Sequence, residues 1–303
     1  MANIKELRGR ITSIGNISKI TKAMEMVASM KLRKIQNRAL AIRPYTEELR
    51  GLLGHLAGSI SSETEIPLFT QRAEKKTTGI FVVSSDRGLC GAYNANVMAK
   101  VHEFERELAD SDPQRKLKFY VYGKKGYTYL ARRGYDVERF YAEPPLDALE
   151  FSAARIVGKD LVDDFSAGKI DDVRIAFTAF ETVARFAPQL DAFLPVSEEL
   201  VSDAIKERDL DEAESKFKHG YLLEPDAETL LNRLVGRYLE TVVFDAMLES
   251  LASEMASRRM AMKGATDAAD RMGKDLKKTY NRARQESITK ELLDIVGGAN
   301  AVS

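Results

Sequence analysis

The hydrophobic positions between residues 3 and 43 recur at alternating steps of three and four, which is the spacing of a coiled-coil helix. This first seam consists of Ile4, Leu7, Ile11, Ile14, Ile17, Ile20, Met24 and Val27, and after a shift it continues with Leu32, Ile35, Ala39 and Ile42. Pro44 lacks a backbone donor, so we expect it either to kink this helix or to start a second one. Helical spacing resumes at Leu49 and ends before Gly58.

The middle of the chain alternates short apolar, β-branched runs with helical patterns. The runs predict strands at 78–85, 117–122, 137–141 and 173–180, and the segment 189–195 is expected to pair beside the last of them. Helical patterns occupy 94–108, 126–133 and 151–165. Strands that alternate with helices predict an α/β layer with a largely parallel sheet.

The region from 226 to 296 contains no proline and predicts one very long terminal helix, which at 1.5 Å per residue would measure roughly 100 Å. Many members of its seam are small or polar, whereas a stable zipper prefers Leu and Ile at these positions. The predicted seam is Leu234, Tyr238, Thr241, Asp245, Leu248, Ala252, Met255, Arg259, Met262, Thr266, Ala269, Leu276, Tyr280, Ala283 and Ser287. The natural partner of such a helix is the N-terminal helix of the same chain.

These patterns together predict an α/β fold in which the N- and C-terminal helices form a long antiparallel coiled coil with an inserted, Rossmann-like α/β domain. The predicted domains are an N-terminal coiled-coil helix at 1–58, a globular α/β domain at 59–215 and a C-terminal coiled-coil helix at 216–303.

Charge is distributed unevenly along a chain whose net charge is zero. Residues 1–43 carry ten basic and two acidic side chains, whereas residues 191–228 carry twelve acidic and four basic ones. The basic helix could be a solvated face, a nucleic-acid surface or a contact for an acidic protein. Aromatic residues, which favour nucleic-acid binding, do not occur between Met1 and Arg43, so an acidic protein partner is favoured.

Motifs for chemistry are sparse. The sequence contains neither a phosphate-binding Gly-x-x-x-x-Gly-Lys-Ser/Thr nor a Gly-x-Gly-x-x-Gly, and the three histidines, His55, His102 and His219, lack metal-ligand spacing. We therefore expect no catalytic residues, no cofactor and no metal. The loop from Asp86 to Gly91 follows a strand at the carboxyl end of the sheet, so it is either a tight turn or, less favoured, a small-molecule site.

Cys90 is the single cysteine, which excludes an intrachain disulfide and suits a reducing compartment. A packed thiol is favoured over a nucleophile because no histidine is near it in sequence. We also expect no secretory signal and no membrane span, since no apolar run reaches about 18 residues.

Five segments resemble the gamma subunit of rotary F-type ATP synthases of the bacterial type. They occur in the family's order along the whole chain, and together they are specific. They are Ile-Thr-Lys-Ala-Met-Glu-Met-Val-Ala at 20–28, Ser-Ser-Asp-Arg-Gly-Leu-Cys-Gly at 84–91, Tyr-Leu-Leu-Glu-Pro at 221–225, Ala-Met-Lys-Gly-Ala-Thr-Asp at 261–267 and Tyr-Asn-Arg-Ala-Arg-Gln-Glu-Ser-Ile-Thr-Lys-Glu at 280–291.

The resemblance implies a non-catalytic central rotor shaft, present in one copy per complex, that couples proton flow to ATP synthesis or hydrolysis and helps to regulate ATPase activity. The implied partners are the alpha and beta subunits of the catalytic hexamer, the epsilon subunit and the membrane proton ring, with no nucleic acid. The implied location is peripheral, on the cytoplasmic face of the bacterial membrane. The alternative from the residues alone is a basic coiled-coil protein that binds nucleic acid or acts as a scaffold.

Carried over by motif, Met24 matches a stretch that contacts the beta-subunit lever. Arg284, Gln285 and Thr289 match positions that meet the beta-subunit catch loop, and Tyr221 and Glu224 match residues near the proton ring. One departure from the family pattern is the basic pair Arg258-Arg259 before Ala261, whose role the resemblance leaves open.

Overall fold

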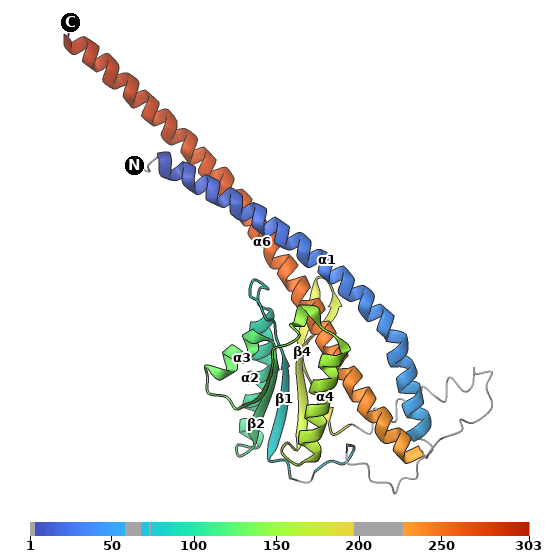
Figure 1. Cartoon of the computed structure of the whole chain (residues 1–303). Coiled ribbons are helices and arrows are strands. Elements are labelled where there is room, and N and C mark those ends of the chain that lie inside the picture. The colour runs from blue at the N-terminus through green and yellow to red at the C-terminus, as the bar shows by residue number, and fades with distance from the viewer. Residues whose placement is uncertain (1–3, 58–67, 73, 197–226, 303) are drawn as a thin grey trace. The chain divides into compact units, whose positions relative to one another are not determined.

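The structure is a computed structural model, and it describes residues 4–57, 68–72, 74–196 and 227–302 (Figure 1). Two long helices, α1 (Ile4–Ala57) and α6 (Ala227–Val302), come from the two ends of the chain. Between them lie β1 (Thr77–Val83), α2 (Tyr93–Ser111), β2 (Lys116–Tyr122), α3 (Lys124–Ala131), β3 (Val137–Tyr141), the 3-10 turn η1 (Leu146–Ala148), α4 (Phe151–Ser166), β4 (Asp172–Thr182) and β5 (Arg185–Leu194). The predicted fold class, two long terminal helices with an inserted α/β domain, is confirmed.

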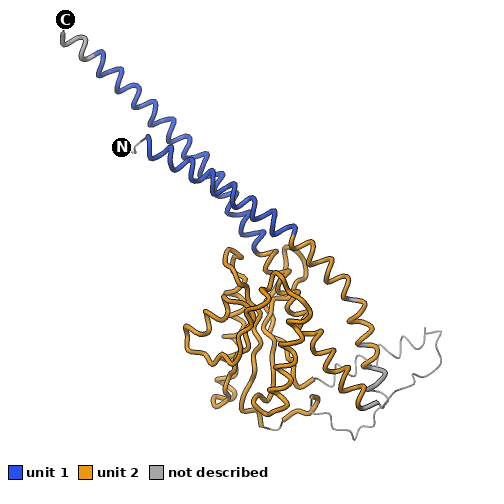
Figure 2. Tube along the Cα trace, in the orientation of Figure 1, with its two compact units in different colours: residues 1–30, 258–303 blue, residues 31–257 orange. Residues whose placement is uncertain are grey.

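The chain forms two compact units, coloured separately in Figure 2. The helix-pair unit contains residues 1–30 and 258–303, and the sheet unit contains residues 31–257. Both long helices contribute to both units, so the boundaries of the compact units differ in kind from the predicted domain boundaries. The predicted domains, 1–58, 59–215 and 216–303, stay predictions. Pro44 lies inside α1, which excludes the alternative that a second helix starts there.

The sheet unit is built on five strands in the order β3-β2-β1-β4-β5. The four strands from β3 to β4 are parallel to their neighbours, as the alternation of strands and helices predicts. The edge strand β5 pairs antiparallel with β4 through a tight hairpin, which confirms that the segment 189–195 lies beside it.

Alternate residues of β1 enter two separate hydrophobic cores, because successive side chains of a strand point to opposite faces. Ile80 and Val82 pack with α2 and α3, whereas Phe81 and Val83 belong to a larger core. That larger core contains η1, α4 and the parts of α1 and α6 that belong to the sheet unit. Between Leu231 and Ser257, α6 is buried on several faces, which explains why a single narrow seam describes this part poorly.

In the helix-pair unit, α1 and α6 run antiparallel. Hydroxyl oxygens of Thr21 and Thr266 lie 2.7 Å apart, and Ser18 Oγ donates to Asp270 Oδ1 at 2.7 Å. Gly273 lies near Ile14, so later residues of α6 contact earlier residues of α1, as expected for an antiparallel pair. The predicted antiparallel pairing of the terminal helices is therefore present in this unit.

The seam predicted for α1 is wrong at three positions between Ile14 and Leu32, whereas the predicted members Leu32 and Ile35 are buried. Ile17, Ile20 and Val27 were assigned to the seam, but 47%, 60% and 47% of their surfaces are exposed. The helix instead turns Thr21 and Ala28 toward its interior side. The physical reason is that Thr21 and Ala28 continue the seven-residue repeat of Leu7 and Ile14, and Ser18 continues that of Ile4 and Ile11, whereas Ile17, Ile20 and Val27 do not.

The seam predicted for α6 is confirmed in the helix-pair unit. Met262, Thr266 and Ala269 are buried, and the half-buried positions continue at the same spacing with Leu276, Tyr280, Ala283 and Ser287. Gly273 belongs to the same stripe, although the sequence pattern omitted it. Small or polar residues therefore stand in the seam of both helices among larger apolar ones, at Thr266, Ala269 and Gly273 on α6 and at Ser18, Thr21 and Ala28 on α1.

Candidate functional site

The outward surface of α1 in the helix-pair unit is unusually apolar for an exposed helix. Its large exposed hydrophobic side chains are Ile17, Ile20, Met26, Val27 and Met30. Large contiguous apolar patches on a protein surface often mark sites of protein–protein contact. Met24, the candidate contact residue on this helix, is half-buried at the border of the stripe.

The C-terminal part of α6 extends past the start of α1. If the register of Thr21 with Thr266 continues, Ile4 lies level with Ala283, so residues from Arg284 onward have no level counterpart among the described residues of α1. Arg284, Gln285 and Thr289 are all exposed there. The same end of α6 exposes Ile288, Leu292, Leu293, Ile295 and Val296.

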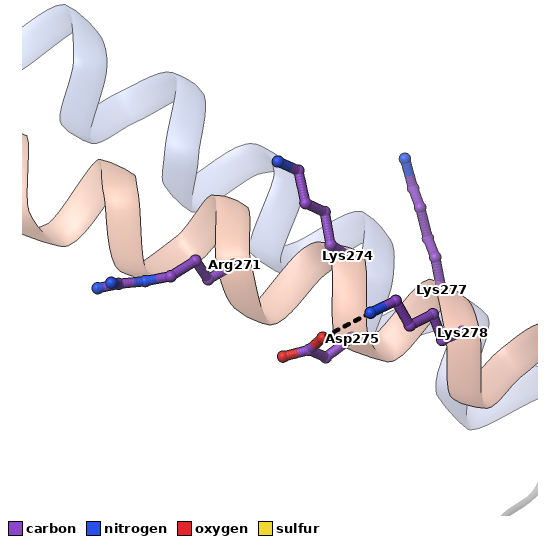
Figure 3. A pocket seen from close by; sticks show the side chains of 5 residues that line it. All are labelled: Arg271, Lys274, Asp275, Lys277 and Lys278. Carbon is purple, nitrogen blue, oxygen red and sulfur yellow. Dashed lines mark ion pairs between the residues drawn. The ribbon is translucent and has the colours of Figure 1, made fainter.

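Positive charge gathers on α6 just before this end. A surface hollow of about 540 Å³ is lined by Arg271, Lys274, Asp275, Lys277 and Lys278 (Figure 3). Asp275 pairs with Lys278 at 3.7 Å, and it is the only acidic side chain of the five. All five are exposed and come from two turns of one helix, so they cannot enclose a small molecule, but they present net positive charge to an acidic surface.

Arg258 and Arg259, the basic pair that departs from the family pattern, are both half-buried. Tyr221 and Glu224, the candidate residues for contact with the proton ring, lie outside the described residues, as does most of the acidic region 191–228. Of the remaining candidate contact residues, Arg284, Gln285 and Thr289 lie close together at the C-terminal end of α6, and Met24 lies on α1.

The glycine loop after β1 serves the fold. The two carboxylate oxygens of Asp86 accept the backbone N–H groups of Lys124 and Leu146 at 3.1 and 2.9 Å. Leu89 and Gly91 have φ values of 64° and 58°, a conformation that most side chains disfavour. Since the polar groups of Asp86 are used internally, the loop is a structural turn, and the small-molecule alternative gains no support.

The buried thiol of Cys90 also belongs to this turn. The amide of Asn94 donates to its sulfur at 3.3 Å, and the thiol lies 3.8 Å from the carbonyl of Arg87. The prediction of a packed thiol is confirmed.

His102 lies on α2 and is half-buried. Its two ring nitrogens lie 2.9 Å from a Glu105 carboxylate oxygen and 2.9 Å from the Tyr129 hydroxyl. The side chain of His55 and all of His219 lie outside the described residues. Within the parts of the chain that the structure describes, no group of three or more His, Cys, Asp or Glu could hold a metal ion.

The sequence pattern missed the exposed stripe of α1 because it assigned the same residues to the seam. The signal that could have found it is the small and polar seam of α6, whose best counterpart on α1 is the equally small and polar face of Ser18, Thr21 and Ala28. Among the described residues, no helix is both long and apolar enough to cross a membrane.

Comparison with known proteins connects this arrangement to one family. The family model described as ATP synthase matches residues 3–302. The ATP synthase gamma chain of Chloroherpeton thalassium is 39% identical and aligns over 100% of this chain and 99% of its own length. The gamma chain of Mycobacterium sp. (strain KMS) is 40% identical over 100% of this chain and 98% of its own.

Solved structures show the same fold at lower identity. The rotor of the Euglena gracilis mitochondrial ATP synthase has a TM-score of 0.62 and 18% identity, and the match covers 94% of this chain and 98% of that one. A chain in the OSCP/F1/c-ring assembly of the same enzyme has a TM-score of 0.66 and 20% identity, covering 99% of this chain and 94% of that one.

Proposed function

Because the chain belongs to the ATP synthase gamma chain family, we propose that it is the central rotor shaft of an ATP synthase. In this role it couples proton flow through a membrane ring to ATP synthesis or hydrolysis at the beta subunits. The observation that carries the proposal is the helix-pair unit, in which α6 extends past α1 and both helices keep apolar and basic side chains exposed.

A shaft that turns inside a ring must not dock deeply at one angle. Exposed apolar side chains on α1 and lysines on α6 offer contacts that are shallow and replaceable. A solvent-exposed ion pair contributes only about 0–1 kcal/mol, so basic residues can exchange one acidic partner for another during rotation. These properties suit a surface that moves past a surrounding hexamer of alpha and beta subunits.

The contacts with the hexamer involve both helices of the pair. Met24 touches the beta-subunit lever, and Arg284, Gln285 and Thr289 meet the beta-subunit catch loop. The exposure of these last three side chains supports this assignment. The apolar side chains after Asp294 contact the apolar bearing that surrounds the tip of the shaft. An uncharged helix end avoids burying an unpaired charge there.

The sheet unit is the foot of the rotor. It contacts the epsilon subunit, and Tyr221 and Glu224 contact the proton ring. The chain is peripheral in the membrane complex, one copy per complex, and lies on the cytoplasmic face of a bacterial membrane. Catalysis belongs to the beta subunits, which agrees with the lack of a phosphate-binding loop in this sequence.

Met24→Lys tests the contact with the beta subunits in the assembled complex. The added ammonium binds the acidic lever too tightly at one angle, so ATP-driven proton pumping falls relative to ATP hydrolysis. Met24→Leu conserves the volume without adding charge and serves as the matched control. Normal pumping by the Met24→Lys complex would contradict the proposed contact.

Copurification tests the proposed function as a whole. A tagged full-length chain, expressed with the alpha and beta subunits of its own organism, is expected to recover both in a stable complex with ATPase activity, whereas the chain alone hydrolyses no ATP. Failure to recover either subunit would refute the rotor assignment.

A further inference from the structure

β4 continues beyond its parallel neighbour in the sheet. β1 pairs with β4 only from Asp172 to Ala176, whereas β4 extends to Thr182. Thr178 therefore has no β1 residue beside it. An unpaired, buried backbone edge is costly unless another group supplies its hydrogen bonds.

The pairing on the other side of β4 shows which way Thr178 points its backbone groups. Thr178 lies opposite Pro188 of β5, and proline has no N–H to donate. In an antiparallel pair such a position is one of those that exchange no hydrogen bonds, so the N–H and C=O of its partner point away from β5. Both backbone groups of Thr178 thus face the side that β1 has left.

Helix α6 takes the place of the missing strand there. Thr178 N–H donates to Ser250 Oγ at 3.0 Å, and Ser253 Oγ donates to the carbonyl oxygen of Thr178 at 3.1 Å. Two residues further on, Phe180 N–H donates to a carboxylate oxygen of Glu249 at 3.3 Å. Ser250 and Ser253 are completely buried, so no water competes for these bonds.

The same face of α6 continues to the glycine loop. Ser257 Oγ donates to the carbonyl oxygen of Cys90 at 2.6 Å, and Ser257 is itself buried. The three serines are spaced by three and four residues, which places them in one row along the helix. This serine row, Ser250, Ser253 and Ser257, thus bonds to the backbone of β4 and to the backbone of the turn after β1.

Hydrogen bonds from the serine row to the backbone restrict the rotation of α6 about its own axis more sharply than apolar packing does. Hydrophobic contact is non-directional, so apolar side chains alone define the rotation of a helix about its axis less sharply than directional bonds do. A hydrogen bond weakens steeply as its geometry departs from linear, and the serine row has two anchor points about one and a half turns apart. Any turn of α6 against the sheet therefore strains all three bonds at once.

We propose that the serine row fixes the angle of α6 about its axis in the sheet unit and transmits torque between the sheet and this helix. The inference rests on the proposed rotor function, in which force enters through the foot and leaves through the helix pair. The serines are positioning residues that act through α6 and touch no nucleotide.

The test measures torsional stiffness in the assembled, immobilised complex. A bead is attached through Glu107→Cys, an exposed position of α2, because the native Cys90 thiol is buried. The angular variance of the bead is recorded while the complex is paused with bound nucleotide. Ser250→Ala combined with Ser253→Ala and Ser257→Ala is expected to raise the variance at least about twofold, and the ratio of protons pumped to ATP hydrolysed falls under load.

Two controls separate torque transmission from general stability. The Thr178 hydroxyl is buried in the same contact and has no hydrogen-bond partner in the described structure, so Thr178→Val leaves the serine row intact and the variance unchanged. Keeping one hydroxyl, as in Ser257→Thr combined with Ser250→Ala and Ser253→Ala, is expected to recover part of the stiffness that the triple alanine variant loses. A merely structural role lowers the yield of complex without changing the variance of the complexes that assemble.

The outcomes distinguish this inference from the proposed function. If the wild-type complex rotates but the triple variant shows wild-type variance, the torque role of the serine row is refuted and the rotor function stands. If the wild-type chain neither assembles nor rotates, the proposed function itself fails.

Discussion

Gly273 offers a direct test of how the two helices of the helix-pair unit are aligned. A methyl group added at Gly273 would lie 3.7 Å from Cγ2 of Ile14, which is ordinary van der Waals contact. Gly264, also inside α6, would place the same methyl group in open space, with nothing within 4 Å. Alanine at these two positions therefore differs only in whether the new methyl group touches α1.

The expected stabilisation follows from two contributions. Replacing glycine by alanine in a helix interior stabilises it by about 0.8–1.0 kcal/mol, and both variants gain this. Covering part of the Ile14 side chain adds about 0.5 kcal/mol at Gly273, less than the ~0.8 kcal/mol of a fully buried methylene. The totals are thus about 1 kcal/mol for Gly264→Ala and about 1.5 kcal/mol for Gly273→Ala.

Hydrogen exchange of the full chain, followed by mass spectrometry, reports local opening of this unit. At ~1.4 kcal/mol per factor of ten, Gly264→Ala should slow exchange of nearby amides about fivefold and Gly273→Ala about tenfold. Only Gly273→Ala should give extra protection to the α1 peptide around Ile14. Faster exchange in Gly273→Ala would mean that the backbones lie closer than this register allows, and equal protection would mean that Ile14 makes no contact there.

Two further predictions concern the sheet unit. Gly123 has φ of 97°, and a Cβ added there would lie 2.0 Å from the Ser84 carbonyl oxygen, so Gly123→Ala should abolish folding, as measured by circular dichroism. Gly134 has φ of 76° but open space around an added Cβ, so Gly134→Ala should cost only about 1–2 kcal/mol of stability. Burial alone would raise the pKa of Asp164, but the bonded ammonium of Lys169 and further donors hold that pKa below its usual value. The stability from Asp164 is thus present above its unfolded pKa of about 3.9 and is lost as pH falls through the lowered folded pKa. Asp164→Asn should cost about 1–3 kcal/mol at pH 7 in urea denaturation and remove this part of the acid dependence; an unchanged acid profile would contradict the assignment.

Much of the fold follows from local patterns in the sequence. Strand β3 has the predicted bounds, 137–141, and β2 begins one residue before its prediction. These strands are apolar runs between turn signals, where periodicity and composition agree. β1 ends at Val83, two residues earlier than predicted, and the hydroxyls of Ser84 and Ser85 donate to the backbone carbonyl oxygens of Tyr122 and Arg87.

Contacts between distant segments could not be predicted in the same way. That α6 bonds to Thr178 depends on where β1 ends and on Pro188 lying opposite, and neither fact shows in the pattern of α6 itself. Buried serines in a long helix resemble any other small residues in sequence. Only the structure shows that Ser250 and Ser253 complete the edge of a strand.

The candidate contact residues were predictable to different degrees. Arg284, Gln285 and Thr289 follow a motif near the chain end, and the structure exposes all three, although their contacts stay predictions. Tyr221 and Glu224 were assigned by motif alone, and they lie outside the described residues. A motif can assign a residue to a role, but the surroundings of that residue come from the fold.

The phase of α1 shows why its seam was mispredicted and what the observed phase achieves. Turning the helix by one residue would bury Ile17, Ile20 and Val27, and each fully buried aliphatic side chain contributes about 1.5–3 kcal/mol. The observed phase forgoes this gain and places Thr21 against Thr266, whose paired hydroxyls fix the register as polar seam residues do in coiled coils. An isolated coiled coil has no reason to prefer that arrangement. A shaft that turns inside a ring does, because its apolar side chains are then left for shallow contacts with the ring that surrounds it.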